Sequence, residues 1–172
     1  MIVPARQFGT LIGLLALCTV LWILTPHFMT VSNLLNVAEQ TSINAIVAVG
    51  MTFVILSGGI DLSVGSIVAL SGVVLGTSLQ AGQPLAIALP LSLAVGLACG
   101  LANGALVSWG ELPPFIVTLG TMGIYRGLTL LISNGLPVHI LPREFSYLGS
   151  GNLLGVPFVL WILLACAAMM KH

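Results

Sequence analysis

The chain has 172 residues, of which 58% are hydrophobic and only 5% are charged, and its mean hydropathy is +1.19. Four Lys and Arg residues balance four Asp and Glu residues, so the chain offers no basic surface that would attract nucleic acid. The composition predicts an integral membrane protein built from helices, because the alternating pattern of a transmembrane barrel is absent.

Two segments open the chain. Residues 8–24 are apolar and predict a first span that ends where Pro26 removes a backbone donor. No small-residue cleavage pattern follows this run, so an uncleaved helix is expected rather than a signal peptide. Residues 30–42 mix polar and apolar side chains and predict an interfacial amphipathic segment, which leads into a short second span over about residues 43–56.

A polar, glycine-rich break follows the second span, with the sequence SGGIDLSVGS over residues 57–66. Irregular backbone at membrane depth is tolerated only where protein covers it or water reaches it. An ionisable residue in such a setting is a functional candidate, and this stretch holds Asp61. Two interpretations stay open: Asp61 or Ser63 caps the helix that begins near Val64, or Asp61 lies near a transport path.

The third and fourth spans are predicted over residues 64–79 and from Pro84 to about residue 109. In the fourth span Gly96, Gly100 and Gly104 recur every four residues, which predicts a helix face that another backbone can approach closely. Asn103 lies beside this face. Its amide is costly in hydrocarbon unless it is paired, so it either bonds to a neighbouring helix or lines a wet path.

The fifth span is predicted from Pro114 to about residue 132 and carries Arg126 beyond its middle. Arg126 either extends its side chain to the far interface or pairs with a carboxylate such as Glu39 or Asp61. Residues 133–155 are polar and predict an external loop, and a sixth span is expected over about residues 157–170.

Together these elements predict an all-α, polytopic transmembrane bundle of about six spans, with residues 1–172 forming a single transmembrane domain. An even number of spans places both termini on one side of the membrane. Arg6 and Lys171 lie near those termini, so the bias of positive residues toward the cytoplasm predicts that both ends are cytoplasmic.

The sequence holds no sign of an active site. All three histidines fall outside the predicted spans, the three cysteines lack metal-ligand spacing, and no phosphate-binding loop is present. We therefore expect no catalytic residue, no metal and no cofactor.

Residues 44–66, NAIVAVGMTFVILSGGIDLSVGS, resemble the signature of the ribose-type sugar ABC-importer permeases. Later segments are similar to the same family in the same order, and the resemblance covers most of the chain from about Asn33 onward. These segments are GLANG at 100–104, PFIVTLGT at 114–121, YRG at 125–127 and SNGLPV at 133–138.

The resemblance implies a transmembrane permease subunit in the bacterial inner membrane. Its implied partners are an extracytoplasmic sugar-binding protein, a separate ABC ATPase that hydrolyses ATP, and a second permease subunit. Members of the family continue past the sixth span into a cytoplasmic loop that docks on the ATPase, followed by more helices. The resemblance therefore implies that this chain corresponds to the amino-terminal half of a permease.

For a path that carries a neutral sugar, the spans supply hydroxyl, amide and carboxylate groups. The candidates are Ser57, Asp61, Ser63, Asn103, Thr118 and Thr121. The alternative for each hydroxyl is a bond to a preceding carbonyl of its own helix. Two other functions stay open: a non-transporting fragment or structural half-permease partner that binds through its glycine face, and, with less support, a secondary transporter, for which Asp61 stands nearly alone as an intramembrane acid.

Overall fold

The computed structural model describes residues 5–138, 145, 151–153 and 156–169. The regular secondary structure of this part is helical except for two short antiparallel strands, β1 (Asn152–Leu153) and β2 (Val156–Pro157). The helices are α1 (Ala5–Leu24), α2 (Val31–Leu56), α3 (Val64–Gln80), α4 (Leu85–Ser108), α5 (Pro114–Ile132) and α7 (Phe158–Met169). Most of the predicted external loop over residues 133–155 lies outside the described residues.

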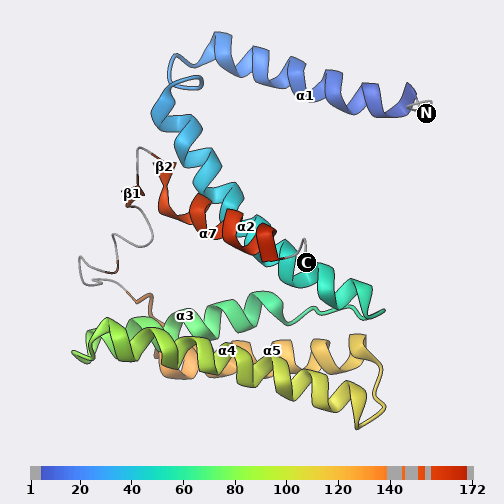
Figure 1. Ribbon diagram of the computed structural model, residues 1–172, viewed down its shortest axis with the longest axis vertical. Coiled ribbons are helices and arrows are strands. Elements are labelled where there is room, and N and C mark those ends of the chain that lie inside the picture. The colour runs from blue at the N-terminus through green and yellow to red at the C-terminus, as the bar shows by residue number, and fades with distance from the viewer. Residues whose placement is uncertain (1–4, 139–144, 146–150, 154–155, 170–172) are drawn as a thin grey trace.

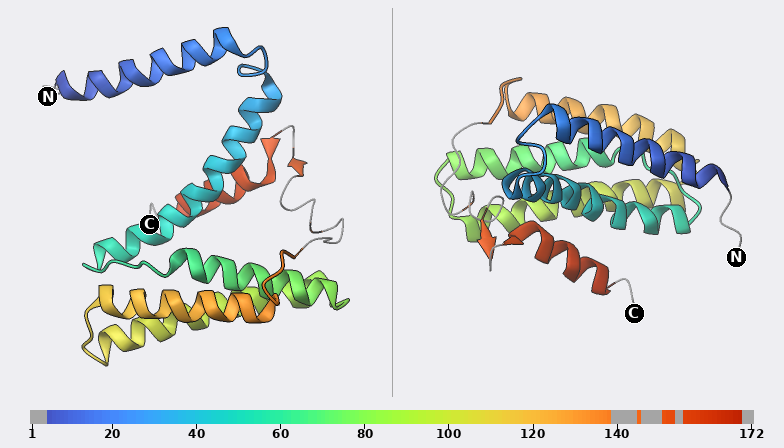
Figure 2. Two further views of the ribbon diagram at one scale, coloured as in Figure 1. Left: turned by 180° about the vertical axis from the view of Figure 1, so that it is seen from behind. Right: turned by 90° about the horizontal axis from the view of Figure 1, so that it is seen from above.

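Helices α3, α4 and α5 form a three-helix bundle, shown side by side in Figure 1. Its buried core holds one side chain from each helix, namely Leu70, Cys99 and Tyr125. A polar contact also joins two of the helices, because the Ser92 hydroxyl of α4 donates to the Ser71 carbonyl of α3 at 2.9 Å. The second layer consists of α2 with α7 along it, and α1 extends away from the far end of α2 (Figure 2).

Helix α2 corrects the sequence prediction for its region. The expected interfacial segment and short second span are one continuous helix of 26 residues. No proline interrupts this stretch, and its polar side chains bond to their own helix: the Ser42 hydroxyl donates to the Ala38 carbonyl at 2.7 Å and the Thr52 hydroxyl to the Ala48 carbonyl at 2.8 Å. Polar residues that satisfy themselves in this way do not end a helix.

The bounds of α3, α4 and α5 agree with the predicted spans to within one or two residues. Within the described residues, three helices are long and apolar enough to cross a membrane, namely α2, α4 and α5. The apolar parts of α1, α3 and α7 are shorter. The all-helical membrane class is therefore established, whereas the count of six spans stays a prediction.

The predicted glycine face of α4 is closely packed at one end and has no close neighbour at the other. A Cβ atom at Gly96 would lie 3.1 Å from the Ser71 hydroxyl oxygen and 3.9 Å from Ile67, so here α3 approaches α4 closely. At Gly100 and Gly104 a Cβ atom would meet nothing within 4 Å among the described residues. No described helix approaches those two positions closely, so the predicted contact there stays a prediction for a second polypeptide.

This difference predicts the stability of two matched variants. Gly96→Leu is expected to lower the free energy of unfolding by about 1–3 kcal/mol, because the larger side chain must displace α3. Gly100→Leu, four residues along the same helix, is expected to change it by no more than about 0.5 kcal/mol. Unfolding of the two variants by SDS titration in detergent micelles measures both values, and equal destabilisation would contradict the prediction.

Candidate functional site

The break between α2 and α3 starts with a glycine turn that closes α2. Gly58 has a φ of 79°, in the left-handed region that favours glycine. Its N–H donates to the Ile55 carbonyl at 2.9 Å, and the Gly59 N–H donates to the Val54 carbonyl at 3.0 Å. This pair of bonds is the Schellman pattern that satisfies the last carbonyls of a helix. This turn reverses the chain at the end of α2 and places Asp61 next to the three-helix bundle.

A chain of hydrogen bonds then joins the start of α3 to α4 and α5. The Ser63 N–H and hydroxyl both donate to Oδ1 of Asp61, at 2.7 and 2.6 Å. The Asn103 side-chain N–H₂ donates to the Ser63 hydroxyl oxygen at 2.8 Å. The Tyr125 hydroxyl lies 3.3 Å from Oδ1 of Asn103 and 3.1 Å from the Cys99 carbonyl, and its one proton is shared between these two acceptors.

The network is buried at its centre. Ser63 is 0% exposed, Asn103 5% and Tyr125 7%. A buried polar group without a partner costs about 1–3 kcal/mol, so the three side chains depend on one another. Through the two bonds from Ser63 they orient the Asp61 carboxylate, which lies at the edge of the network.

The capping interpretation takes a specific form in this geometry. Ser63 is the N-cap residue of α3, yet its side chain makes no capping bond. Asp61 instead accepts from the backbone and hydroxyl of Ser63, so it stabilises the turn that leads into the helix. Oδ2 of Asp61 receives no hydrogen bond in the part of the chain that the structure describes.

Asp61 lines a pocket of about 290 Å³. The pocket lies where the ends of four helices meet, because the α2–α3 break and the α4–α5 turn are at the same end of the bundle (Figures 1 and 2). Glycines and apolar side chains make up much of its wall. The polar side chains on it are Ser57, Asp61, Asn103, Ser108 and Thr118.

Thr118 ties the first turn of α5 to the break. Its hydroxyl lies 3.2 Å from the Ile60 carbonyl, across the pocket wall, and 2.8 Å from the Pro114 carbonyl of its own helix. It is 4% exposed. The contact to Ile60 fixes the position of α5 relative to the residue that precedes Asp61.

The six predicted path residues are therefore divided by the structure. Ser57, Asp61, Asn103 and Thr118 line the pocket. Ser63 lies behind it as the link between Asp61 and Asn103, and Thr121 is buried one turn further along α5, with its hydroxyl 3.4 Å from the Thr118 carbonyl. Their roles in transport stay predictions.

Two residues of the site were not among the sequence candidates. Tyr125 follows Thr118 and Thr121 at helical spacing, and Ser108 continues the four-residue spacing of Gly100 and Gly104. The same periodicities place each of them on the helix face that carries the candidates. Extending the two patterns by one step would have found both.

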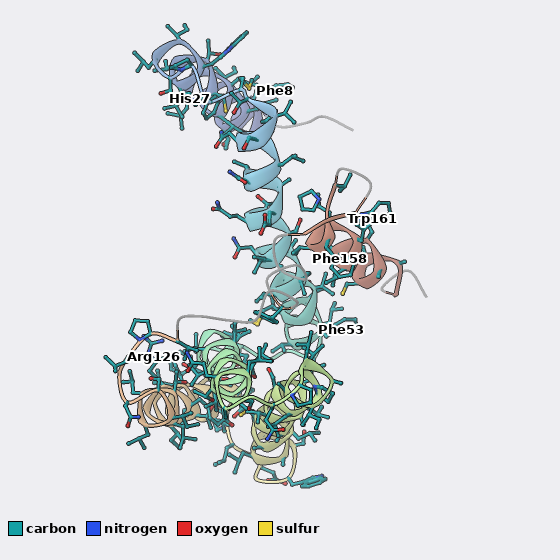
Figure 3. All side chains as sticks on the ribbon, turned by 90° about the vertical axis from the view of Figure 1, so that its left-hand side faces the viewer. Phe8, His27, Phe53, Arg126, Phe158 and Trp161 are labelled. Carbon is teal, nitrogen blue, oxygen red and sulfur yellow. The ribbon has the colours of Figure 1, made fainter. Side chains whose placement is uncertain are left out.

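Arg126 lies apart from this site. It is exposed and lines a separate open pocket with Leu62 and Ser66 at the start of α3 and with Gly123 of its own helix, whereas the pocket of Asp61 does not include it. Figure 3 looks along the bundle and shows Arg126 on the opposite side from Phe53, which lies near the end of α2. Within the described residues Arg126 forms no ion pair with Glu39 or Asp61, so the interpretation that its side chain extends to an interface is retained.

The fold and the pocket define a helical membrane protein with a polar site at a helix break. Residues 33–170 match the family model described as the branched-chain amino acid transport system / permease component. The chain belongs to this permease family. Family membership and the apolar helices together show an integral inner-membrane protein.

Relatives in the family carry names of sugar and signal import. The ribose import permease protein RbsC of Escherichia coli K12 is 43% identical over 171 residues, which cover 95% of this chain and 53% of that protein. RbsC of Bacillus subtilis is 39% identical, over 92% of this chain and 53% of its own length. The autoinducer 2 import system permease protein LsrC of Photorhabdus luminescens is 36% identical, over 92% and 48%.

The chain spans about half the length of the curated relatives it matches. No solved structure matches it. The resemblance to ribose-type permeases that the sequence motifs indicated is confirmed by these relatives.

Proposed function

We propose that the chain forms part of the translocation path of a binding-protein-dependent ABC importer for a monosaccharide or a related sugar-like solute. Its proposed partners are an ATPase subunit that supplies the energy, an extracytoplasmic sugar-binding protein and a second permease subunit. The names of the relatives, ribose import permease and autoinducer 2 import permease, support this proposal.

The observation that carries the proposal is the pocket at the meeting of the four helix ends. Its volume of about 290 Å³ is just below the range for small-molecule sites, about 300–1,000 Å³. Hydroxyl, amide and carboxylate groups line it at Ser57, Asn103 and Asp61. The Ser57 hydroxyl already donates to the Val54 carbonyl at 2.7 Å, so Ser57 and Asp61 offer mainly acceptors, which the hydroxyls of a neutral sugar can donate to.

The break also supplies a place for movement. The hydrogen-bonded network joins α3, α4 and α5, whereas α2 connects to α3 through residues 57–63, which lie outside both helices. We propose that α3, α4 and α5 move as a unit relative to α2 when the translocation path changes between a state open to the outside and a state open to the cytoplasm. A ligand drives such a change only if it binds the two states with different affinity, and we propose that the pocket at the junction changes shape between the states and so binds the solute differently in each.

We propose further that the chain crosses the membrane six times with both termini in the cytoplasm. Reporter fusions after Gly82 are then expected to report the outside, and fusions after Glu111 the inside, since these turns flank α4 at its two ends. Alkaline phosphatase and fluorescent-protein fusions measure this directly. The reverse result would overturn the orientation.

A chimera tests the proposed function. The chain replaces the 171 residues to which it is matched in Escherichia coli RbsC, in cells that keep the ribose-binding protein and the ATPase of that system but lack RbsC. We expect the chimera to restore ribose uptake above the level of the deletion strain. A chimera that reaches the membrane in normal amounts yet transports nothing would contradict the proposal.

The alternative function is a structural half-permease partner. The open surface along Gly100 and Gly104 favours it, because a Cβ atom there would meet no neighbour within 4 Å among the described residues. Under this alternative the unmodified chain binds a second permease polypeptide in the membrane, but pocket substitutions such as Thr118→Val leave uptake by the assembled complex unchanged.

A further inference from the structure

The electrostatic character of the pocket follows from the helix ends that build it. A helix carries about half a positive charge at its amino end and half a negative charge at its carboxyl end. The amino ends of α3 and α5 and the carboxyl ends of α2 and α4 all meet at the pocket. With two ends of each sign, the partial charges oppose one another and their sum is close to zero.

The formal charges around the pocket do not cancel. Asp61 is the one charged residue among those that line it, and no Lys, Arg or His does so. The next acid is Glu111, which is exposed in the α4–α5 turn at the same end of the bundle. The one cation on α5, Arg126, lines a separate pocket with Leu62 and Ser66 near the start of α3, and it is not on the wall of the pocket that Asp61 lines.

The network behind Asp61 directs this charge into the pocket. Both donors of Ser63 converge on Oδ1, and the Asn103 amide holds the Ser63 hydroxyl from behind. Oδ2 is left for the pocket that Asp61 lines. A carboxylate fixed in this manner cannot turn away from an approaching anion without breaking the buried network.

We propose that the pocket selects solutes by charge: it admits neutral and cationic solutes and repels anions such as sugar phosphates, with Asp61 as the selectivity residue. This inference rests on the proposed function, in which the pocket lies on the solute path. A phosphate ester carries about −1.5 to −2 charges at pH 7. It would meet the Asp61 carboxylate with no cation in the pocket wall to offset the repulsion.

Charged thiol reagents measure this selectivity without transport. In the full chain with Cys18, Cys99 and Cys166 replaced by Ala, Ser57→Cys places a thiol in the pocket wall, and Ser133→Cys places a reference thiol at the far end of α5. Each purified protein reacts in detergent with methanethiosulfonates that carry a trimethylammonium or a sulfonate group. The quantity measured is the ratio of the two modification rates at position 57, divided by the same ratio at position 133.

The expected ratio favours the cationic reagent and falls about tenfold in Asp61→Asn. Two unit charges about 4 Å apart interact in water by the equivalent of about a fivefold change in an equilibrium constant, and by more in a partly desolvated pocket. The Asp61 charge raises the modification rate of the cationic reagent and lowers that of the anionic one, so the ratio of the two rates changes by more than either rate alone. Asp61→Glu, which keeps the charge, and Glu111→Gln, which removes a carboxylate outside the pocket wall, are each expected to change the ratio by less than about threefold.

A second measurement needs no substitution at Asp61. The ratio at position 57 is expected to decrease as the salt concentration is raised from about 0.01 to 1 M, because the screening length falls from about 30 to 3 Å. A ratio that is independent of salt, or one that Asp61→Asn leaves unchanged, overturns the charge selectivity. Neither result bears on ribose uptake by the chimera, so failure of this inference is distinguishable from failure of the proposed function.

Discussion

Asp61→Asn is expected to fold normally yet lower ribose uptake by the chimera about tenfold or more. The asparagine side-chain oxygen still accepts from the N–H and hydroxyl of Ser63, as Oδ1 of Asp61 does. Its amide group, however, replaces the charged acceptor on the pocket side with a donor. Hydrogen bonds to charged groups contribute about 1.5–3 kcal/mol, and the loss of one such bond to a sugar hydroxyl corresponds to at least a tenfold effect.

Asp61→Ala separates the two roles of this residue. It removes the pocket group and also the acceptor that orders the turn before α3, so a loss of about 1 kcal/mol in stability is expected in addition to the loss of uptake. Initial rates of labelled ribose uptake and melting temperatures are measured on the same variants. Normal uptake by Asp61→Asn would refute a transport role for the charge, and Glu111→Gln is the control that keeps both quantities unchanged.

Tyr125→Ala is expected to lower the free energy of unfolding by about 3 kcal/mol, the largest stability effect expected for this chain. The ring is 7% exposed and packs with Leu70 and Cys99 in the core that α3, α4 and α5 share. Its removal leaves a cavity that the surrounding helices fill only in part. The substitution also removes the hydroxyl that donates to the Cys99 carbonyl and Asn103.

Two matched variants assign this loss to its causes. Tyr125→Phe keeps the ring and removes the hydroxyl, and is expected to cost about 0.6 kcal/mol, the average for a hydrogen bond between membrane helices. Ile124→Ala truncates the neighbouring side chain, which is 59% exposed, and is expected to change stability by less than about 0.5 kcal/mol. SDS titration in micelles gives all three values, and a Tyr125→Ala value equal to that of Ile124→Ala would refute the packing role.

Much of the fold follows from the sequence because membrane helices are specified by local composition. The apolar runs and the proline and glycine turns around α3, α4 and α5 predicted these helices to within one or two residues. The backbone of such a helix satisfies its own hydrogen bonds, so no distant contact is needed to place its ends. The error at α2 has the same origin: the polar residues of segment 30–42 were read as the mark of an interface, but Ser42, at its end, bonds to the Ala38 carbonyl of its own helix.

The family, too, was evident in the sequence. The motif over residues 44–66 and the later segments occur in a fixed order, and the match over residues 33–170 confirms the relationship. Asp61 and Asn103 were singled out because an ionisable or amide group among apolar residues is costly unless it has a partner, and Thr118 because its hydroxyl suits a path for a neutral sugar. The free-energy cost of burying such residues can therefore be recognised from the amino-acid sequence alone.

Only the tertiary structure decided which partner each of these residues has. Residues 61, 103 and 125 are far apart in the chain, and their meeting depends on the helices α3, α4 and α5 packing in one particular register. Packing also made Gly96 a close contact while leaving Gly100 open to the pocket, although the two glycines are equivalent in the sequence pattern. Local composition determines where a membrane helix begins and ends, whereas the faces that two helices present to each other depend on side chains from both, which no single segment contains.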